Sequence, residues 1–107
     1  IEVVPASLSG GPHAYVGLMN YLTFDTRWEK RVQMKIALEG MNEHGLTASG
    51  LEFQEAVFEK PAPKFKSVHY LLVLHELLAR CDTVQSALDH LASVRVVSDG
   101  SLPGVHW

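Results

Sequence analysis

Residues 32–53, with the sequence VQMKIALEGMNEHGLTASGLEF, constrain the fold more than any other part of the chain. Apolar and polar residues alternate over 32–39, which is the period of a strand with one buried face. Turn-forming residues follow at 42–45, and a second run, rich in small residues, extends over 46–53. We therefore predict a β-hairpin that closes on a bulged turn at Gly45. Because an isolated hairpin buries little apolar surface, another apolar element must cover it.

Two further strands are expected before the hairpin. Residues 1–5 and 15–23 are rich in strand-forming side chains, and the Gly, Ser and Pro residues of 7–12 predict a loop between them. Within the hairpin itself, Gly40 and Gly50 are positions where a missing side chain allows another backbone or a ligand to approach closely. The N-terminal half is therefore predicted to be all strand.

The pattern changes to helix in the second half of the chain. The prolines and lysines of 59–66 predict an exposed connector, after which a helix capped by Ser67 is expected to run to about Cys81. Asp82, with Gln85 three residues later, is the expected cap of a second helix. Its apolar stripe consists of Val84, Ala87, Leu88, Leu91 and Val94.

A short strand over 95–97 completes the expected elements. Strands followed by helices indicate an α+β fold, with two antiparallel helices packed on an antiparallel sheet. A chain of 107 residues has room for one domain, 1–107. Because it opens on an apparent strand at Ile1 and stops on apolar residues at Trp107, we expect it to be an internal fragment of a larger domain.

Charge and hydropathy exclude two classes of partner. The net charge is −3 and no basic stripe is present, so no nucleic acid is expected to bind. The longest apolar run, 70–74, is far shorter than the roughly 20 residues that a membrane span requires. The single cysteine, Cys81, excludes an intrachain disulfide and leaves the redox compartment undecided.

The histidines and the cysteine give no catalytic or metal-binding motif. No two of the six histidines stand four residues apart on an expected helix, and Ala79 stands where a zinc-protease motif beginning at His75 needs its second ligand. We therefore expect His75 to be a buried or partly buried helix residue and no metal site. Cys81 at a helix C-terminus is expected to be a packing thiol, since the helix dipole there disfavours a thiolate.

Two acidic and three aromatic residues near the hairpin have ordinary and functional interpretations. Glu39 and Glu43 are expected to be solvated carboxylates, and only burial would make either an acid or a base. Tyr21, Phe24 and Trp28 are expected to pack in the core or in a lid, or to line a hydrophobic substrate pocket.

Four pieces of the sequence, in order and spacing, resemble one known family. They are GMNEHGL at 40–46, ASGLEF at 48–53, RCDTV at 80–84 with AL at 87–88, and VHW at 105–107. Together they resemble the choloylglycine hydrolase family, the bile salt hydrolases and penicillin V acylases. The resemblance implies an αββα sandwich of the N-terminal nucleophile (Ntn) hydrolase class. It also implies a parent enzyme that cleaves linear carbon-nitrogen amide bonds with an N-terminal cysteine thiolate, its own α-amino group acting as base.

The sequence departs from this family at the catalytic centre. Residue 1 is Ile1 where the family has its cysteine, and Cys81 falls in the helical region instead. No catalytic residue is therefore expected in this chain. The family's later Asn and Arg, which follow the His-Trp pair, are absent as well.

The resemblance implies Phe24, Leu51 and Glu52 as substrate-binding residues. Phe24 matches a pocket-loop aromatic of the family, and Glu52 replaces an asparagine that donates to the oxyanion in bile salt hydrolases. Because an ionised carboxylate repels an oxyanion, either Glu52 is protonated, or it has another role, or the parent is not a bile salt hydrolase. Penicillin V acylases vary at this position, which slightly favours an acylase-like branch.

The expected function is that of a fragment of a linear amide hydrolase, inactive by itself, that supplies scaffold and substrate-pocket wall. Its expected partner is a small-molecule amide, such as a conjugated bile salt, penicillin V or an N-acyl compound, and no cofactor is expected. The parent's oligomeric state, a homo-oligomer included, and its compartment stay open. The alternative is a non-catalytic binding or interaction module of the same fold.

Overall fold

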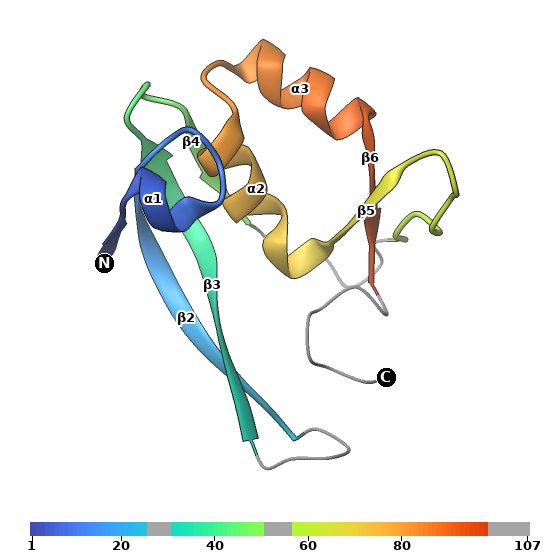
Figure 1. Ribbon diagram of the computed structural model, residues 1–107, viewed down its shortest axis with the longest axis horizontal. Coiled ribbons are helices and arrows are strands. Elements are labelled where there is room, and N and C mark those ends of the chain that lie inside the picture. The colour runs from blue at the N-terminus through green and yellow to red at the C-terminus, as the bar shows by residue number, and fades with distance from the viewer. Residues whose placement is uncertain (26–30, 51–56, 99–107) are drawn as a thin grey trace.

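The computed structural model describes residues 1–25, 31–50 and 57–98, which form an α+β fold (Figure 1). Four antiparallel strands make one sheet in the order β1-β2-β3-β4, and two parallel strands, β5 and β6, make a separate pair. The strands are β1 Glu2–Val4, β2 Tyr15–Asp25, β3 Arg31–Asn42, β4 Thr47–Ser49, β5 Lys66–His69 and β6 Val94–Val97. The helices are α1 Ala6–Ser9, the 3₁₀ turn η1 Tyr70–Leu72, α2 Val73–Arg80 and α3 Val84–Ala92.

The predicted hairpin at β3 is confirmed, together with its turn. Gly45 has a φ of +84°, its N–H donates to the carbonyl of Asn42 at 2.9 Å, and the N–H of Asn42 donates to the carbonyl of Leu46 at 2.9 Å. A positive φ costs glycine nothing, which explains its place in this turn. The return strand β4 is described as far as Ser49, and the predicted extension over 51–53 lies outside the described residues.

The expected alternation of β3 fails at Leu38 because of a β-bulge. Leu18 of β2 pairs with Glu39 and Met19 pairs with Ala37, so Leu38 is the extra residue of the longer strand. Ala37 is buried where the alternation predicts that Leu38 would be, and Leu38 is 39% exposed. Such a bulge bends the strand and is fixed by cross-strand pairing, which the alternation within one strand cannot show.

Helix α2 covers one face of the sheet. Leu78 of α2 is fully buried against Val4, Tyr15 and Ala37, which come from β1, β2 and β3. Gly40 lies under the same helix, and a Cβ at this position would come within 2.9 Å of a Leu78 methyl carbon and 2.6 Å of the Val16 carbonyl oxygen. The close approach predicted at Gly40 is therefore confirmed.

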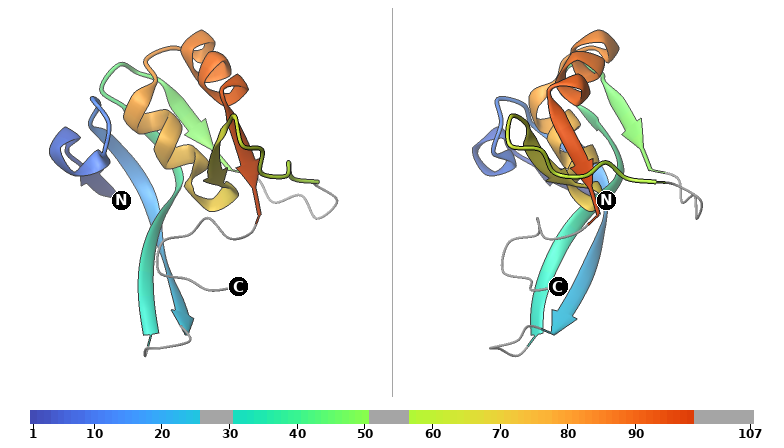
Figure 2. Two further views of the ribbon diagram at one scale, coloured as in Figure 1. Left: turned by 45° about the vertical axis from the view of Figure 1, so that its right-hand side comes forward. Right: turned by 90° about the vertical axis from the view of Figure 1, so that its right-hand side faces the viewer.

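The expected packing of both helices on the sheet is confirmed for α2 only. Helix α3 contacts β6, and its Ala87 packs with Leu46 and Cys81 at the turn end of the hairpin. Val84 and Leu88 of the predicted apolar stripe are exposed. Helix α2 lies between the antiparallel sheet and the β5–β6 pair (Figure 1 and Figure 2).

The predicted start of the first helix at Ser67 is wrong. Residues 66–69 form β5, which pairs in parallel with β6 from Lys66↔Val94 to His69↔Val97, and α2 begins only at Val73. Pairing with a strand that follows almost thirty residues later overrides the local helical pattern. The predicted end of this helix at Cys81 is confirmed.

Two further sequence predictions differ from the structure, and two agree with it. The second helix is capped by Thr83 rather than Asp82, because Thr83 and Ser86 exchange the two hydrogen bonds of a capping box. The predicted loop at 7–12 overlaps the single helical turn α1, which Gly10 ends with a φ of +81°. The expected connector has no helix or strand over 57–65, and the predicted strand over 95–97 is β6.

Candidate functional site

A hollow of about 350 Å³ lies on the sheet face that α2 does not cover. Cross-strand pairs share a face of a sheet, so the pairs Val16↔Met41 and Met41↔Thr47 place these side chains together. Ala48, next in sequence to Thr47, packs instead on the core under α2. We call the side toward α2 the inner face and the opposite side the outer face.

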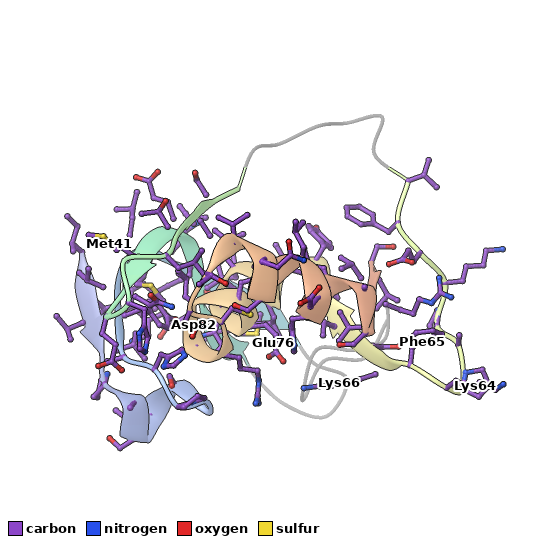
Figure 3. All side chains as sticks on the ribbon, turned by 90° about the horizontal axis from the view of Figure 1, so that it is seen from above. Met41, Lys64, Phe65, Lys66, Glu76 and Asp82 are labelled. Atoms are coloured by element: carbon purple, nitrogen blue, oxygen red, sulfur yellow. The ribbon has the colours of Figure 1, made fainter. Side chains whose placement is uncertain are left out.

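The lining of the hollow is mainly apolar, with a few polar groups. Val16, Leu18 and Met41 supply apolar surface, and Glu39 and Ser49, a second cross-strand pair, supply a carboxylate and a hydroxyl. Leu18 is 42% and Met41 46% exposed. Apolar walls with a small number of polar groups are typical of ligand pockets. Seen from above, Met41 lies at the sheet end of the molecule, with Glu76 of α2 and Lys64 of the connector progressively farther away (Figure 3).

The hollow has polar groups but no assembled catalytic machinery among the described residues. Its hydroxyls belong to Thr47 and Ser49, and no histidine lines it to act as a general base. A serine or threonine hydroxyl needs such a base to become a nucleophile. The described lining therefore offers a ligand apolar surface, two hydroxyls and the Glu39 carboxylate.

The three predicted substrate-binding residues are not brought together within the described part of the chain. Leu51 and Glu52 lie outside the described residues. Strand β4 ends at Ser49, which lines the hollow and stands two residues before Leu51 in the sequence. Phe24 pairs with Val32 at the far end of β2, and only its backbone is described. At about 3.3 Å per strand residue, Phe24 stands roughly 20 Å along β2 from Leu18.

The predicted aromatic cluster is described at Tyr21 alone. Its side chain is half exposed, and its hydroxyl donates to the Glu2 carboxylate at 3.0 Å. This hydrogen bond lowers the pKa of Glu2 and raises that of Tyr21. The side chains of Phe24 and Trp28 lie outside the described part of the structure.

Cys81 is a buried packing thiol, as predicted. Its side chain lies in the cluster of Leu46 and Ala87, and its Sγ is 3.7 Å from the carbonyl oxygen of Ser86. Burial raises the pKa of the Cys81 thiol, and the nearby Asp82 and Glu76 carboxylates act in the same direction. A thiol that resists ionisation is a poor nucleophile.

Asn42 of the GMNEHGL segment is a buried link between the hairpin and α2. Its Nδ2 donates to the carbonyl oxygens of Leu78, at 3.0 Å, and Cys81, at 2.5 Å. Its Oδ1 accepts from the N–H groups of His44 and Leu46, at 3.0 and 3.1 Å. The two bonds from Nδ2 satisfy carbonyls at the end of α2, where a helix leaves its last carbonyls without partners inside the helix. The sequence predicted Asn42 as a turn residue and did not predict this role.

His75 is a partly buried helix residue, as predicted, and joins three elements. Its Nε2 lies 2.7 Å from the carbonyl oxygen of Ser9, and its Nδ1 lies 2.5 Å from the hydroxyl of Tyr15. A carbonyl oxygen only accepts, so Nε2 carries the proton and Nδ1 accepts from the tyrosine hydroxyl. Burial raises the pKa of Tyr15, which keeps this hydroxyl a donor.

One group of potential metal ligands lies at the hairpin turn. His13, Glu43 and His44 offer one ligand atom each within 4.8 Å of one another. Histidine spacing along the sequence did not predict it, because His13 precedes β2 and the other two residues follow β3. Turn and loop meet only when β2 and β3 pair.

No family model matches this sequence, and a search of curated proteins found no match. Within residues 1–25, 31–50 and 57–98, the helices are all too short to span a bilayer.

Proposed function

We propose that this chain is part of a linear amide carbon-nitrogen hydrolase similar to the bile salt hydrolases and penicillin V acylases. In this proposal it supplies scaffold and substrate-pocket wall, and the attacking nucleophile comes from outside these 107 residues. The observation that carries the proposal is the apolar hollow on the outer face of the sheet. The resemblance of GMNEHGL and the other segments gives the hydrolase class.

The apolar side chains exposed on the outer face support the proposal of an αββα sandwich. In such a sandwich each sheet packs helices on one face and the second sheet on the other. Here α2 occupies the inner face, while Val3, Leu18 and Met41 remain exposed. An apolar sheet face of this kind suits contact with a second sheet or with an acyl or steroid group.

The motif that carries the resemblance has a scaffolding role in this proposal. Gly40 admits Leu78, Asn42 links the turn to α2, and Gly45 takes the positive φ of the turn. Together they hold β4, and so Thr47 and Ser49, at the edge of the hollow. In the parent enzyme, a cysteine thiolate would attack the substrate carbonyl beside this wall, with its α-amino group as base. Phe24, Leu51 and Glu52 stay the proposed contacts to substrate.

The test compares amine release by two forms of the protein. Penicillin V and a conjugated bile salt are each incubated with the 107-residue polypeptide and with the product of the complete coding sequence. We expect hydrolysis by the complete product and none by the polypeptide, because its only cysteine, Cys81, is buried. Turnover by the polypeptide alone, or inactivity of the complete product toward both substrates, would contradict the proposal.

A non-catalytic binding module is the second candidate, favoured by the mainly apolar lining of the hollow. It predicts saturable binding of penicillin V or a bile salt, with NMR shifts at Leu18 and Met41, and no hydrolysis by either form. Met41→Asp should abolish these shifts, because a carboxylate opposes burial of an apolar ligand. Leu88→Asp on the exposed side of α3 is the matched control and should keep them.

A further inference from the structure

We propose that His13, Glu43 and His44 form a binding site for a divalent transition-metal ion, with Zn²⁺ as the ion it suits best. The site stands at the turn end of the hairpin and does not depend on the amide hydrolase proposed above. Its three ligand atoms come from two segments that are distant in sequence, the loop before β2 and the turn after β3. Binding would therefore join these two segments.

The three side chains already lie at short range from one another. Nδ1 of His13 is 3.9 Å from Oε1 of Glu43, and the rings of His13 and His44 meet edge to face with centroids 4.2 Å apart. Ligand atoms about 2.1 Å from one tetrahedral zinc ion are roughly 3.4 Å apart. Since the ligand atoms lie within 4.8 Å of one another, rotation of the exposed His44 side chain would bring them close to this spacing.

The backbone that carries these ligands is held by hydrogen bonds on both sides. The N–H of His13 donates to the carbonyl of Ala79 at 3.0 Å, and that of His44 donates to the Asn42 side chain at 3.0 Å. Ala14 and Glu43 form two bonds, from the Glu43 N–H to the Ala14 carbonyl and from the Ala14 N–H to Oε1 of Glu43, each 3.0 Å long. A fixed backbone lowers the entropic cost of ordering the ligands.

The hydrogen bond from Ala14 also orients the Glu43 carboxylate. It occupies one lone pair of Oε1 and leaves the other lone pair of Oε1, and Oε2, available to a metal ion. Hydrogen bonds of this kind to a ligand carboxylate are a regular feature of metal sites and raise their affinity. The contact thus gives Glu43 the geometry of a supported ligand rather than that of a freely solvated carboxylate.

The ligand set selects the class of metal. Two imidazoles with one carboxylate suit Zn²⁺ and neighbouring transition metals, whereas Ca²⁺ and Mg²⁺ require oxygen ligands. Three protein ligands leave a coordination position for water.

The test measures metal binding by the purified full-length protein, with ZnCl₂ and CoCl₂ as the probes. We expect one Zn²⁺ to bind per chain in calorimetric titration, and Co²⁺ to give the visible absorption bands of a four- or five-coordinate site. His13→Ala and His44→Ala should each weaken Zn²⁺ binding at least about 100-fold, since each removes a direct ligand. Glu43→Gln, which keeps an acceptor for the Ala14 N–H, should weaken it about 10-fold or more.

The matched control is His90→Gln, because His90 lies on α3 and pairs with Glu76 rather than with this group. Its affinity for Zn²⁺ should equal that of the unaltered protein. His44 is exposed, so His44→Ala should keep the circular dichroism spectrum and melting temperature of the metal-free protein. Zn²⁺ affinity that survives in a His13→Ala/His44→Ala double variant, or that falls as far in His90→Gln, would overturn the proposal.

Discussion

The inner and outer faces of the antiparallel sheet differ in how completely their apolar side chains are covered. On the inner face, Tyr15 and Ala37 are buried against Leu78, which has no exposed surface. On the outer face, Leu18 and Met41 keep more than two fifths of their surface exposed. The same two strands, β2 and β3, supply both faces, and α2 covers the inner one.

This difference separates stability from binding. Buried apolar surface contributes about 25 cal/mol per Å², so the closed inner face contributes most of the sheet's stability. The outer face contributes less and is free to contact a ligand or another layer of structure. Substitutions on the inner face should therefore unfold the protein, whereas those on the outer face should change binding.

The largest expected contrast is between two leucines. Leu78→Ala on α2 leaves a cavity under the helix and should lower the free energy of unfolding by about 3–4 kcal/mol. Leu18→Ala on the outer face should lower it by less than about 1 kcal/mol, because this side chain already contacts water. Chemical denaturation of both variants measures the two losses. Losses of equal size would show that the outer face is as important for folding as the inner one.

The next contrast concerns the link between the turn and α2. Asn42→Asp keeps the shape of the side chain but removes both Nδ2–H donors, so a buried carboxylate would face the carbonyl oxygens of Leu78 and Cys81. We expect a loss of about 3 kcal/mol in the free energy of unfolding at neutral pH. The control Asn20→Asp lies on the exposed part of β2 and should change it by less than about 0.5 kcal/mol. A small loss in Asn42→Asp would mean that α2 and the turn are held by packing alone.

The parts of the fold that could be predicted from the sequence depend on neighbouring residues. The turn follows from the ability of glycine to take a positive φ at Gly45, and the end of α2 at Cys81 follows from the end of the helix's apolar pattern. In contrast, β5 was missed and the bulge at Leu38 was not visible, since both depend on the strands with which they pair. Pairing across the chain is a tertiary property that local propensity does not contain.

The candidate sites show the same limit. GMNEHGL is a distinctive segment of the sequence, but the burial of Asn42 arises only when the end of α2 meets the turn. His13 joins Glu43 and His44 only because β2 and β3 align the loop and the turn at one end of the hairpin. The hollow is a property of three paired strands and has no counterpart in the sequence of any one of them.

The smallest expected effect concerns the side of α2 that points away from the antiparallel sheet, where Glu76 faces β5 and α3. Its Oε1 lies 2.9 Å from Nε of Arg80, 3.2 Å from Nζ of Lys66 and 3.2 Å from Nε2 of His90. Burial raises the pKa of the Glu76 carboxyl, but Lys66, Arg80 and the hydrogen bond from His90 outweigh burial, so the net direction is below the ordinary value of 4.5. The ionised form is therefore the one that the folded protein favours.

Because the pKa of Glu76 is lower in the folded chain than in the unfolded chain, its contribution is complete above the unfolded value and is lost as the pH falls through the folded value. Glu76→Gln should lower the free energy of unfolding by about 1–2 kcal/mol at pH 7, and this deficit should shrink below pH 4.5. Glu39→Gln, an exposed carboxylate on the outer face, is the matched control and should change it by less than about 0.5 kcal/mol. Chemical denaturation at a series of pH values measures the free energy of unfolding of both variants. A deficit in Glu76→Gln that stayed constant with pH would show that shape rather than charge joins α2 to β5 and α3.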